Sequence, residues 1–261
     1  MRLGVQIYTV REFISTKDAY LGSLKKIKDM GYDSVQTYVT HFSPEEHKKI
    51  LDTFGLVSES AGGDYEAMLH DPSAIETAIK EAEQMGTDLI SIGTLPVEQR
   101  DHESGFHTYA ENINQICREL KKAGKKLLYH PHALEFFSFG NEKNGMEILT
   151  EETDPETFWF ALDTHWLQCG GQNPAAYIKR MKGRLPMVHF KDYKIIGGAE
   201  YIEQVCKDFA EVGEGNLNWA EIVDACRASN VKSVVVEQDI CQGDPFDCLR
   251  TSYENMKSFG L

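Results

Sequence analysis

LPMVHFK, residues 185–191, is a short apolar run that carries a histidine and a lysine near its end. Side chains of a β-strand alternate between its two faces, so His189 and Lys191 share one face of a strand formed here. Three further apolar runs carry a possible ligand at or near their end. KLLYH (126–130) ends in His130, FWFALD (158–163) ends in Asp163, and SVVVEQ (233–238) has Glu237 as its second-last residue. Four such strand ends predict one polar site at the mouth of a parallel barrel, where C-terminal strand ends converge.

Apolar runs alternate with helical patterns along the whole chain. The predicted strands are residues 3–8, 33–38, 56–60, 88–93, 126–130, 158–163, 185–191 and 233–238. The helices between them begin at caps followed by proline, such as Ser43-Pro44, and end at glycines such as Gly55. Eight strands alternating with eight helices predict a parallel α/β fold, and we expect residues 1–261 to form a single (β/α)8 barrel domain. The alternative, a doubly wound open sheet, would place a glycine-rich loop where residues 9–12 contain no glycine.

Composition narrows the classes of function. The chain has 261 residues, a net charge of −14 and no basic stripe, which argues against binding to nucleic acid. No apolar run is long enough to span a membrane, and the N-terminus lacks the apolar core of a signal peptide. The six cysteines form no C-x-x-C pair, which is typical of reduced thiols. We therefore expect a cytoplasmic protein without a membrane partner.

The strand-end residues are suited to binding a divalent metal. Asp163, His189 and Glu237 should meet at the barrel mouth although they lie far apart in the sequence. A lone histidine here could be a core residue, but carboxylates after apolar runs are costly unless paired or bound to metal. The fourth ligand should come from the fifth strand or its loop, where the alternatives are His130, His132 and Glu135. Such a ligand set favours Mn²⁺, Mg²⁺ or Co²⁺, with Zn²⁺ as a further alternative.

Several motifs resemble a known family. The matching segments are YHPHALEF (129–136), ALDTHWLQCGGQNP (161–174), VHFKDY (188–193), EVGEGNLNW (211–219) and VVVEQD (234–239). They resemble the sugar phosphate isomerase/epimerase group of the xylose isomerase-like TIM barrels. The resemblance implies one divalent ion, Mn²⁺ as first expectation, held by Glu135, Asp163, His189 and Glu237. In better-known relatives the first glutamate lies at the strand tip, which is His130 here, and Pro131 replaces the usual asparagine.

The resemblance also implies an activity in carbohydrate metabolism. We expect a metal-dependent sugar isomerase or epimerase that removes a proton next to a carbonyl through a metal-stabilised enediolate. Candidate catalytic groups are Glu135, Glu237, His130, His132 and Lys191. Lys191 would stabilise the developing oxyanion, or could simply pair with Asp192 or Glu214. Candidate residues for binding the sugar are Gln6, Tyr8, Glu59, His165 and Trp166. The loop around Gly213 and Gly215 could close over the mouth, or could equally serve as a turn or core segment.

Other functions are compatible with the same residues. A lyase or dehydratase acting on a keto-sugar or cyclitol, such as an inosose dehydratase or a 3-keto-glycoside cleaving enzyme, would use the same metal site. A DNA-repair endonuclease of this barrel type is disfavoured by the acidic charge and by too few strand-end histidines. A sugar-binding barrel without catalysis is disfavoured by the full ligand set. The expected partner is a small sugar or sugar-derived molecule, and a homo-oligomer is suggested by family analogy alone.

Overall fold

A parallel nine-stranded sheet forms the centre of the molecule. The computed structural model describes residues 1–37, 41–140, 143–197 and 206–261. Its strand order is β3-β2-β1-β11-β8-β7-β6-β5-β4, and each neighbouring pair is parallel. The strands are β1 (Arg2–Gln6), β2 (Ser34–Gln36), β3 (Val57–Ser58), β4 (Ala61–Gly62), β5 (Leu89–Ile92), β6 (Lys126–Tyr129), β7 (Phe158–Asp163), β8 (Met187–Phe190) and β11 (Ser233–Val236). β3 and β4 together take the place of the third predicted strand. The sheet curls into the predicted (β/α)8 barrel.

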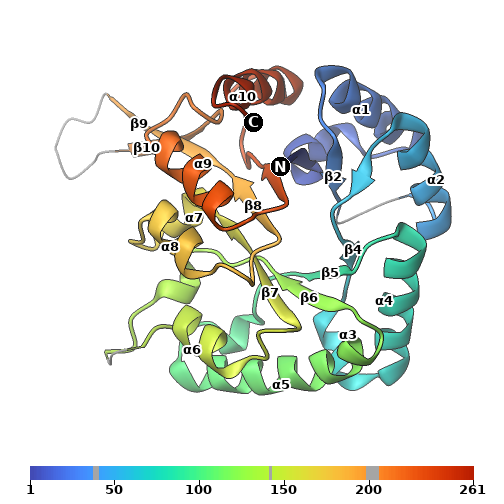
Figure 1. Cartoon of the computed structure of the whole chain (residues 1–261), viewed down its shortest axis with the longest axis vertical. Coiled ribbons are helices and arrows are strands. Elements are labelled where there is room, and N and C mark those ends of the chain that lie inside the picture. Colours follow the sequence, from blue (N-terminus) through green and yellow to red (C-terminus); the bar gives the residue numbers. More distant parts are fainter. Residues whose placement is uncertain (38–40, 141–142, 198–205) are drawn as a thin grey trace.

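Helices surround this sheet, as Figure 1 shows. The predicted crossover helices are α1 (Lys17–Met30), α2 (Pro44–Phe54), α4 (Pro72–Met85), α5 (Glu103–Lys122), α6 (Gly145–Glu152), α8 (Pro174–Arg180), α9 (Trp219–Ala228) and α10 (Pro245–Ser258). The capping signals act as expected: Ser43 and Glu46 form a capping box at α2, and Gly55 ends that helix at φ 65°. Short helices that the sequence did not predict are α3 (Tyr65–His70), α7 (Thr164–Cys169) and the 3-10 turns η1 (Ile7–Phe13), η2 (Val97–Gln99) and η3 (Leu134–Phe136).

Alternation within the strands sets which side chains line the barrel. Leu128, Ala161, Met187 and Val235 are buried and form a separate apolar cluster. They come from the neighbouring strands β6, β7, β8 and β11, so this cluster is a layer inside the barrel. The larger apolar cluster includes the residues between them, such as Leu127 and Leu162, packed toward the helices. A residue two positions after each member of the layer therefore points into the barrel near its mouth.

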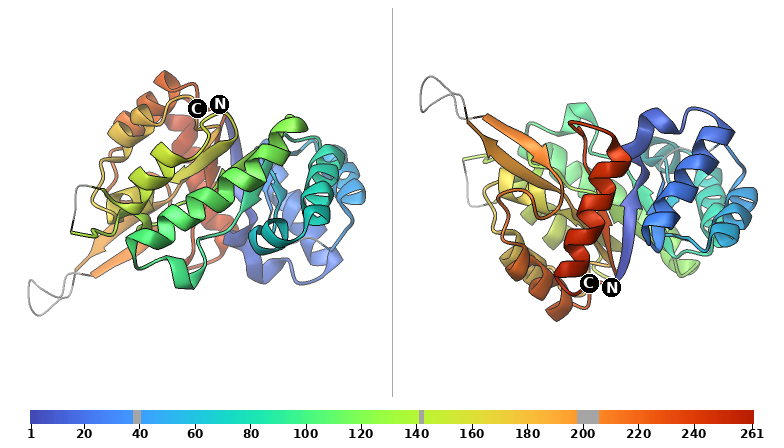
Figure 2. Two further views of the ribbon diagram at one scale, coloured as in Figure 1. Left: turned by 90° about the horizontal axis from the view of Figure 1, so that it is seen from below. Right: turned by 90° about the horizontal axis from the view of Figure 1, so that it is seen from above.

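Two segments differ from the predicted elements. β1 ends at Gln6, and the chain then turns into η1, so Tyr8 is not on a strand and does not share the face of Gln6. The long segment after β8 contains an antiparallel ribbon of β9 (Asp192–Ile196) and β10 (Cys206–Ala210), which lies at the periphery in both views of Figure 2. Residue Tyr38, at the end of the second predicted strand, lies outside the described residues.

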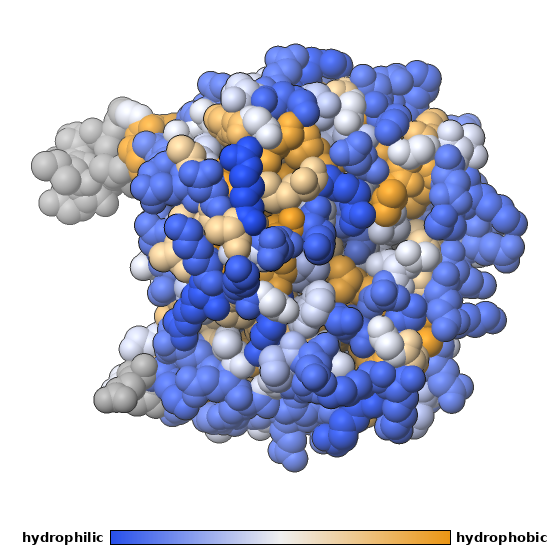
Figure 3. All heavy atoms as spheres, viewed as in Figure 1, coloured by the Kyte–Doolittle hydropathy of each residue, from blue (hydrophilic) through white to orange (hydrophobic). Residues whose placement is uncertain are grey.

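Among the described residues, no helix combines the length and the apolar composition needed to cross a bilayer. The face drawn in Figure 3 is largely hydrophilic, and hydrophobic atoms appear there as separate patches. The first and last residues lie next to each other in both views of Figure 2.

The loop around Gly213 and Gly215 is fastened to a buried carboxylate, which agrees with a turn or core role. Asp192 is fully buried and accepts hydrogen bonds from the backbone N–H groups of Gly213 and Gly215, both at 3.1 Å. It also accepts from the indole N–H of Trp219 at 2.6 Å and from the N–H of Leu217 at 3.3 Å. A Cβ on Gly215 would overlap the Asp192 carboxylate, which explains the glycine. Asp192 thus ties the loop to β9 and α9.

Asp192→Ala is expected to lower the free energy of unfolding by about 3 kcal/mol, because several N–H groups would lose the buried carboxylate to which they donate. Urea denaturation measures this change. Asp29→Ala is the matched control, because Asp29 is exposed and pairs with Lys25 on the surface of α1; its cost should stay below about 1 kcal/mol. Equal costs for the two variants would contradict an anchoring role for Asp192.

Candidate metal centre

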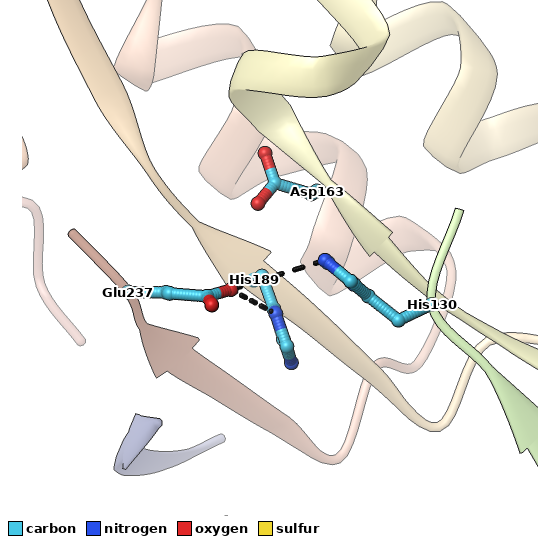
Figure 4. Close-up of side chains that lie close together, drawn as sticks. All are labelled: His130, Asp163, His189 and Glu237. Atoms are coloured by element: carbon cyan, nitrogen blue, oxygen red, sulfur yellow. Dashed lines mark hydrogen bonds and ion pairs between the residues drawn. The ribbon is translucent and has the colours of Figure 1, made fainter. Parts of the chain in front are cut away.

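Four side chains meet at the barrel mouth, one from the end of each of four neighbouring strands. His130, Asp163, His189 and Glu237 each follow a member of the interior apolar layer by two residues, so they point inward as that layer does. Each offers one ligand atom, and these atoms lie within 4.8 Å of one another. Figure 4 shows the four side chains turned toward a common space. They form a group that could hold a divalent ion, and we call them the quartet.

The histidine that follows β6 has the tautomer and the neutral state that a metal ligand needs. His130 Nδ1 lies 3.0 Å from the carbonyl oxygen of Ala161. A carbonyl can only accept, so the proton is on Nδ1 and the lone pair is on Nε2. Nε2 is buried, has no hydrogen-bond partner within the described residues, and lies 3.9 Å from Glu237 Oε2. Burial, with help from His189, holds the pKa of His130 well below its usual value, so the ring is neutral. A neutral imidazole fixed through its second nitrogen is the usual form of a metal-binding histidine.

The two carboxylates of the quartet differ in their partners. Asp163 Oδ1 accepts from the N–H of Trp166 at 2.9 Å, whereas its buried Oδ2 has no hydrogen bond to any described residue. Burial raises the pKa of Asp163 to about 6. Burial also acts to raise the pKa of Glu237, but Lys191 and His189 outweigh it and hold that pKa well below its usual value. Asp163 Oδ2, which lacks a hydrogen bond and has an ion pair with Lys191 at 3.3 Å, and the unpartnered His130 Nε2 belong to one group of ligand atoms, which fits a bound cation.

Lys191 lies against the quartet and is 1% exposed. Its Nζ is 3.0 Å from Asp239, 3.3 Å from Asp163 and 3.4 Å from Glu237. These carboxylates outweigh the effect of burial and raise its pKa, so the side chain stays an ammonium. The expected alternative pairing with Asp192 or Glu214 is not observed, because both of those side chains bind elsewhere. One ammonium among three carboxylates leaves the pocket negatively charged when all are ionised, which favours a further cation.

Glu135, the first ligand implied by the family resemblance, is not part of the quartet. It is fully buried, and its two oxygens accept hydrogen bonds from the hydroxyl of Tyr129 and from the N–H of His132, the latter at 2.8 Å. Tyr129 precedes His130 on β6, so it points away from the barrel interior, and Glu135 follows it there. Burial raises the pKa of Glu135. The structure therefore places His130 in the position expected for Glu135.

A third histidine, His132, and Trp166 adjoin the quartet. The His132 ring centroid is 4.7 Å from that of His130 and 5.4 Å from that of Trp166. Burial lowers the pKa of His132 to about 4, and its Nδ1 has no partner in the described part of the chain. Lys191 Nζ lies 5.3 Å from the Trp166 ring centroid. His132 and Trp166 thus lie beside the quartet.

Of three further residues predicted to bind the sugar, one lines the cavity beside the quartet and two lie away from it. Gln6 lines a cavity of about 230 Å³ that also reaches His130, His189 and Glu237. Tyr8 is 38% exposed beside Arg11 and does not line this cavity. His165 packs under the ribbon, 4.9 Å from the Phe209 ring, with its Nε2 3.3 Å from Cys169 Sγ. Of these three, the cavity takes in Gln6 alone.

Glu59 lies at the opposite end of the barrel. Its carboxylate pairs with Arg2 at 3.0 Å and accepts from the hydroxyl of Ser233 at 2.8 Å. Arg2 and Ser233 are the first residues of β1 and β11, far from the C-terminal strand ends. The predicted strand 56–60 is interrupted after Ser58, and Glu59 therefore points toward the N-terminal ends of the strands. The expectation that it contacts substrate is wrong on this geometry.

Gln36, at the end of β2, is a site residue that the sequence patterns did not single out. Its Oε1 lies 2.6 Å from His189 Nε2, and its side chain lines the same cavity as Gln6. Gln36 orients the imidazole through the nitrogen that does not face Glu237. A signal for it was present, since Gln36 lies near the end of the second predicted strand as Gln6 does in the first.

Comparisons with known proteins agree with this architecture. The family model described as xylose isomerase-like TIM barrel matches residues 24–245. An inosose dehydratase of Clostridium beijerinckii is 25% identical over 161 residues, 56% of this chain and 52% of the relative. Inosose dehydratase 2 of Bacillus cereus is 23% identical over 190 residues, 69% of this chain and 63% of the relative. The chain thus spans about half to two thirds of the length of these curated relatives.

Solved structures share the fold over nearly the whole chain. A sugar phosphate isomerase/epimerase from Parabacteroides distasonis is 20% identical with a TM-score of 0.77, covering 98% of this chain and 94% of that one. An L-ribulose 3-epimerase is 14% identical with a TM-score of 0.71, covering 99% and 94%. The IolI protein with a bound zinc atom is 12% identical with a TM-score of 0.72, covering 99% and 98%. At these identities the likeness establishes the fold.

Proposed function

Because the chain belongs to the xylose isomerase-like TIM-barrel family, we propose that it is a divalent-metal-dependent sugar isomerase or epimerase. The observation that carries the proposal is the quartet, whose four ligand atoms lie within 4.8 Å of one another and three of whose members line one cavity. A divalent ion held by His130, Asp163, His189 and Glu237 would polarise a substrate carbonyl and so ease loss of the neighbouring proton. Mn²⁺ remains our first expectation, and the zinc in the IolI neighbour supports a divalent ion in general.

His132 is proposed to take and return the proton. It is neutral at pH 7, because burial lowers its pKa to about 4, so one ring nitrogen carries a lone pair. It lies beside the quartet without belonging to it, which separates proton transfer from metal binding. Glu135, another candidate for this role, is bound to Tyr129 on the side of β6 that faces away from the barrel interior. Glu237 is engaged with His189 and Lys191.

Lys191 is proposed to stabilise the negative charge that develops on the substrate oxygen. It remains protonated and is fixed by Asp239, Asp163 and Glu237. A buried, preoriented ammonium interacts more strongly with a developing oxyanion than one in water does. Trp166, under the ammonium, offers a flat surface to the sugar ring.

A dehydratase or lyase is the second candidate, favoured by the inosose dehydratases among the curated relatives. Proton removal next to the carbonyl would be the same, and a hydroxyl or alkoxyl group on the adjacent carbon would then leave. Lys191 could supply the proton to that leaving oxygen. The two candidates differ only in the step after proton removal.

Incubation of the Mn²⁺-loaded protein with keto-sugars and inososes in D₂O is expected to introduce deuterium next to the carbonyl. Mass spectrometry and NMR of the products distinguish the candidates, because an isomer keeps the composition of the substrate and a dehydrated product loses water. His132→Gln should slow the exchange roughly 100-fold while metal content is retained. His107→Gln is the control, since His107 is on the surface of α5 and pairs with Glu152. Undiminished exchange in His132→Gln would rule out its role.

A further inference from the structure

A second hollow continues from the cavity over the quartet. It has a volume of about 570 Å³ and lies at the C-terminal ends of β4 and β5. Gly63 and Gly93 line both this hollow and the inner cavity of about 230 Å³. The two spaces therefore adjoin across these glycines, and we call the second one the outer groove. A ligand in the inner cavity has room to extend into it.

Glycine keeps the passage between the two spaces open. A Cβ built on Gly93 would have no heavy atom of the described residues within 4 Å, so no side chain occupies the space beside it. At Gly63 a Cβ would meet Ile90 at 2.7 Å, which shows that the chain packs closely on β5 there. Any larger residue at Gly93 would project into the passage.

The walls of the outer groove indicate what it can hold. Asp64, Glu66 and Glu98 contribute three carboxylates, and Arg100 contributes one guanidinium. Arg100 is engaged with its own loop, because Nε donates to the carbonyl of Leu95 and Nη2 to the hydroxyl of Thr94, each at 2.6 Å. The excess of negative charge disfavours a phosphate or carboxylate and favours hydroxyl groups, which donate to carboxylates.

The groove also has an apolar edge. Pro96 lines it, and Val97 is 72% exposed beside it. An apolar surface next to hydrogen-bond acceptors suits a sugar ring, which has a C–H face and a rim of hydroxyls. The inner cavity, at about 230 Å³, is smaller than most sites for drug-sized ligands, which start at roughly 300 Å³. A ligand larger than the inner cavity would therefore extend into the outer groove.

We propose that the outer groove binds a second, neutral hydroxylated unit attached to the reacting sugar, so that the substrate is a glycoside instead of a free or phosphorylated monosaccharide. This inference rests on the proposed function, because it places the reacting ring over the quartet. It adds the substrate class and a specificity role for Gly93 and for the carboxylates of the outer groove.

Titration calorimetry on the Mn²⁺-loaded protein tests the inference. The probes are maltose, cellobiose, lactose, sucrose and trehalose, with glucose, galactose, fructose and glucose 6-phosphate. At least one disaccharide should bind tenfold or more tightly than each of its component monosaccharides and than glucose 6-phosphate. Gly93→Leu should reduce that ratio at least fivefold. Gly22→Leu is the matched control, since Gly22 lies on the outside of α1 with equally open space around it, and there the ratio should stay within twofold.

A second variant addresses charge without adding bulk. Asp64→Asn combined with Glu98→Gln should narrow the preference for the disaccharide over glucose 6-phosphate at least threefold, and asparagine can keep the cap that Asp64 gives to α3. Equal affinity for disaccharides and monosaccharides, or tighter binding of the phosphate, would overturn this inference alone. If the metal-loaded protein bound none of the sugars, both this inference and the proposed function would fail.

Discussion

Asp163→Asn and Glu237→Gln are each expected to remove the metal and the activity together. A mononuclear site implies about one divalent ion per chain in the wild type. Each substitution replaces a charged ligand by a neutral amide, and the ion supplies several kcal/mol of the catalytic effect, so activity should fall roughly a thousandfold. Metal analysis after dialysis and an assay of proton exchange measure the two effects.

The fold should survive these substitutions. Asparagine at 163 keeps an oxygen for the N–H of Trp166, so the cap of α7 remains. Lys191 would still have Asp239 and one further carboxylate as partners. Asp239→Asn is the matched control, because Asp239 pairs with the same lysine but does not belong to the quartet. Metal retained at one ion per chain in both ligand variants would remove the basis for the proposed centre.

His130→Phe is expected to weaken metal binding, whereas Glu135→Gln is expected to lower the stability of the fold. Phenylalanine keeps a flat ring between His132 and His189 but has no lone pair, so metal affinity should fall roughly 100-fold or more. Glutamine at 135 should leave metal affinity within a few-fold of wild type. It would instead lower the free energy of unfolding by about 1–3 kcal/mol, since its amide group would face either the Tyr129 hydroxyl or the His132 N–H.

Two measurements separate these effects: competition with a metal-sensitive dye gives the affinity, and urea denaturation of metal-free protein gives the stability. The opposite pattern, with metal lost in Glu135→Gln and kept in His130→Phe, would restore Glu135 as the ligand. The pair of variants is decisive because the family resemblance implied Glu135, whereas the strand-end geometry selects His130.

The fold could be predicted because its signals are local. Proline-led caps such as Ser43-Pro44 and glycines such as Gly55 mark helix ends by backbone chemistry alone. The eight predicted crossover helices and the barrel are confirmed. The missed elements α3, α7 and the β9–β10 ribbon are short or depend on contacts made after folding, and the register of the ribbon sets Tyr193 opposite Phe209.

The candidate site could be predicted in part. Asp163, His189 and Glu237 follow the interior layer by two residues, so alternation alone puts them on the inner face. Tyr8 was misplaced because β1 stops at Gln6, and Glu59 because its strand is interrupted. Continued alternation past the end of a strand assigns the wrong face, since the backbone no longer has a period of two.

The sequence by itself determined the barrel, the strand-end positions and three members of the quartet, because alternation and capping act between near neighbours in the chain. Only the tertiary structure decided that His130 completes the quartet, that Glu135 turns back to Tyr129, and that Gln36 orients His189. It also decided that Lys191 is shared by three carboxylates from β7 and from the end of β11. These pairings depend on the stagger of strands around the barrel, which brings together residues that no local pattern relates.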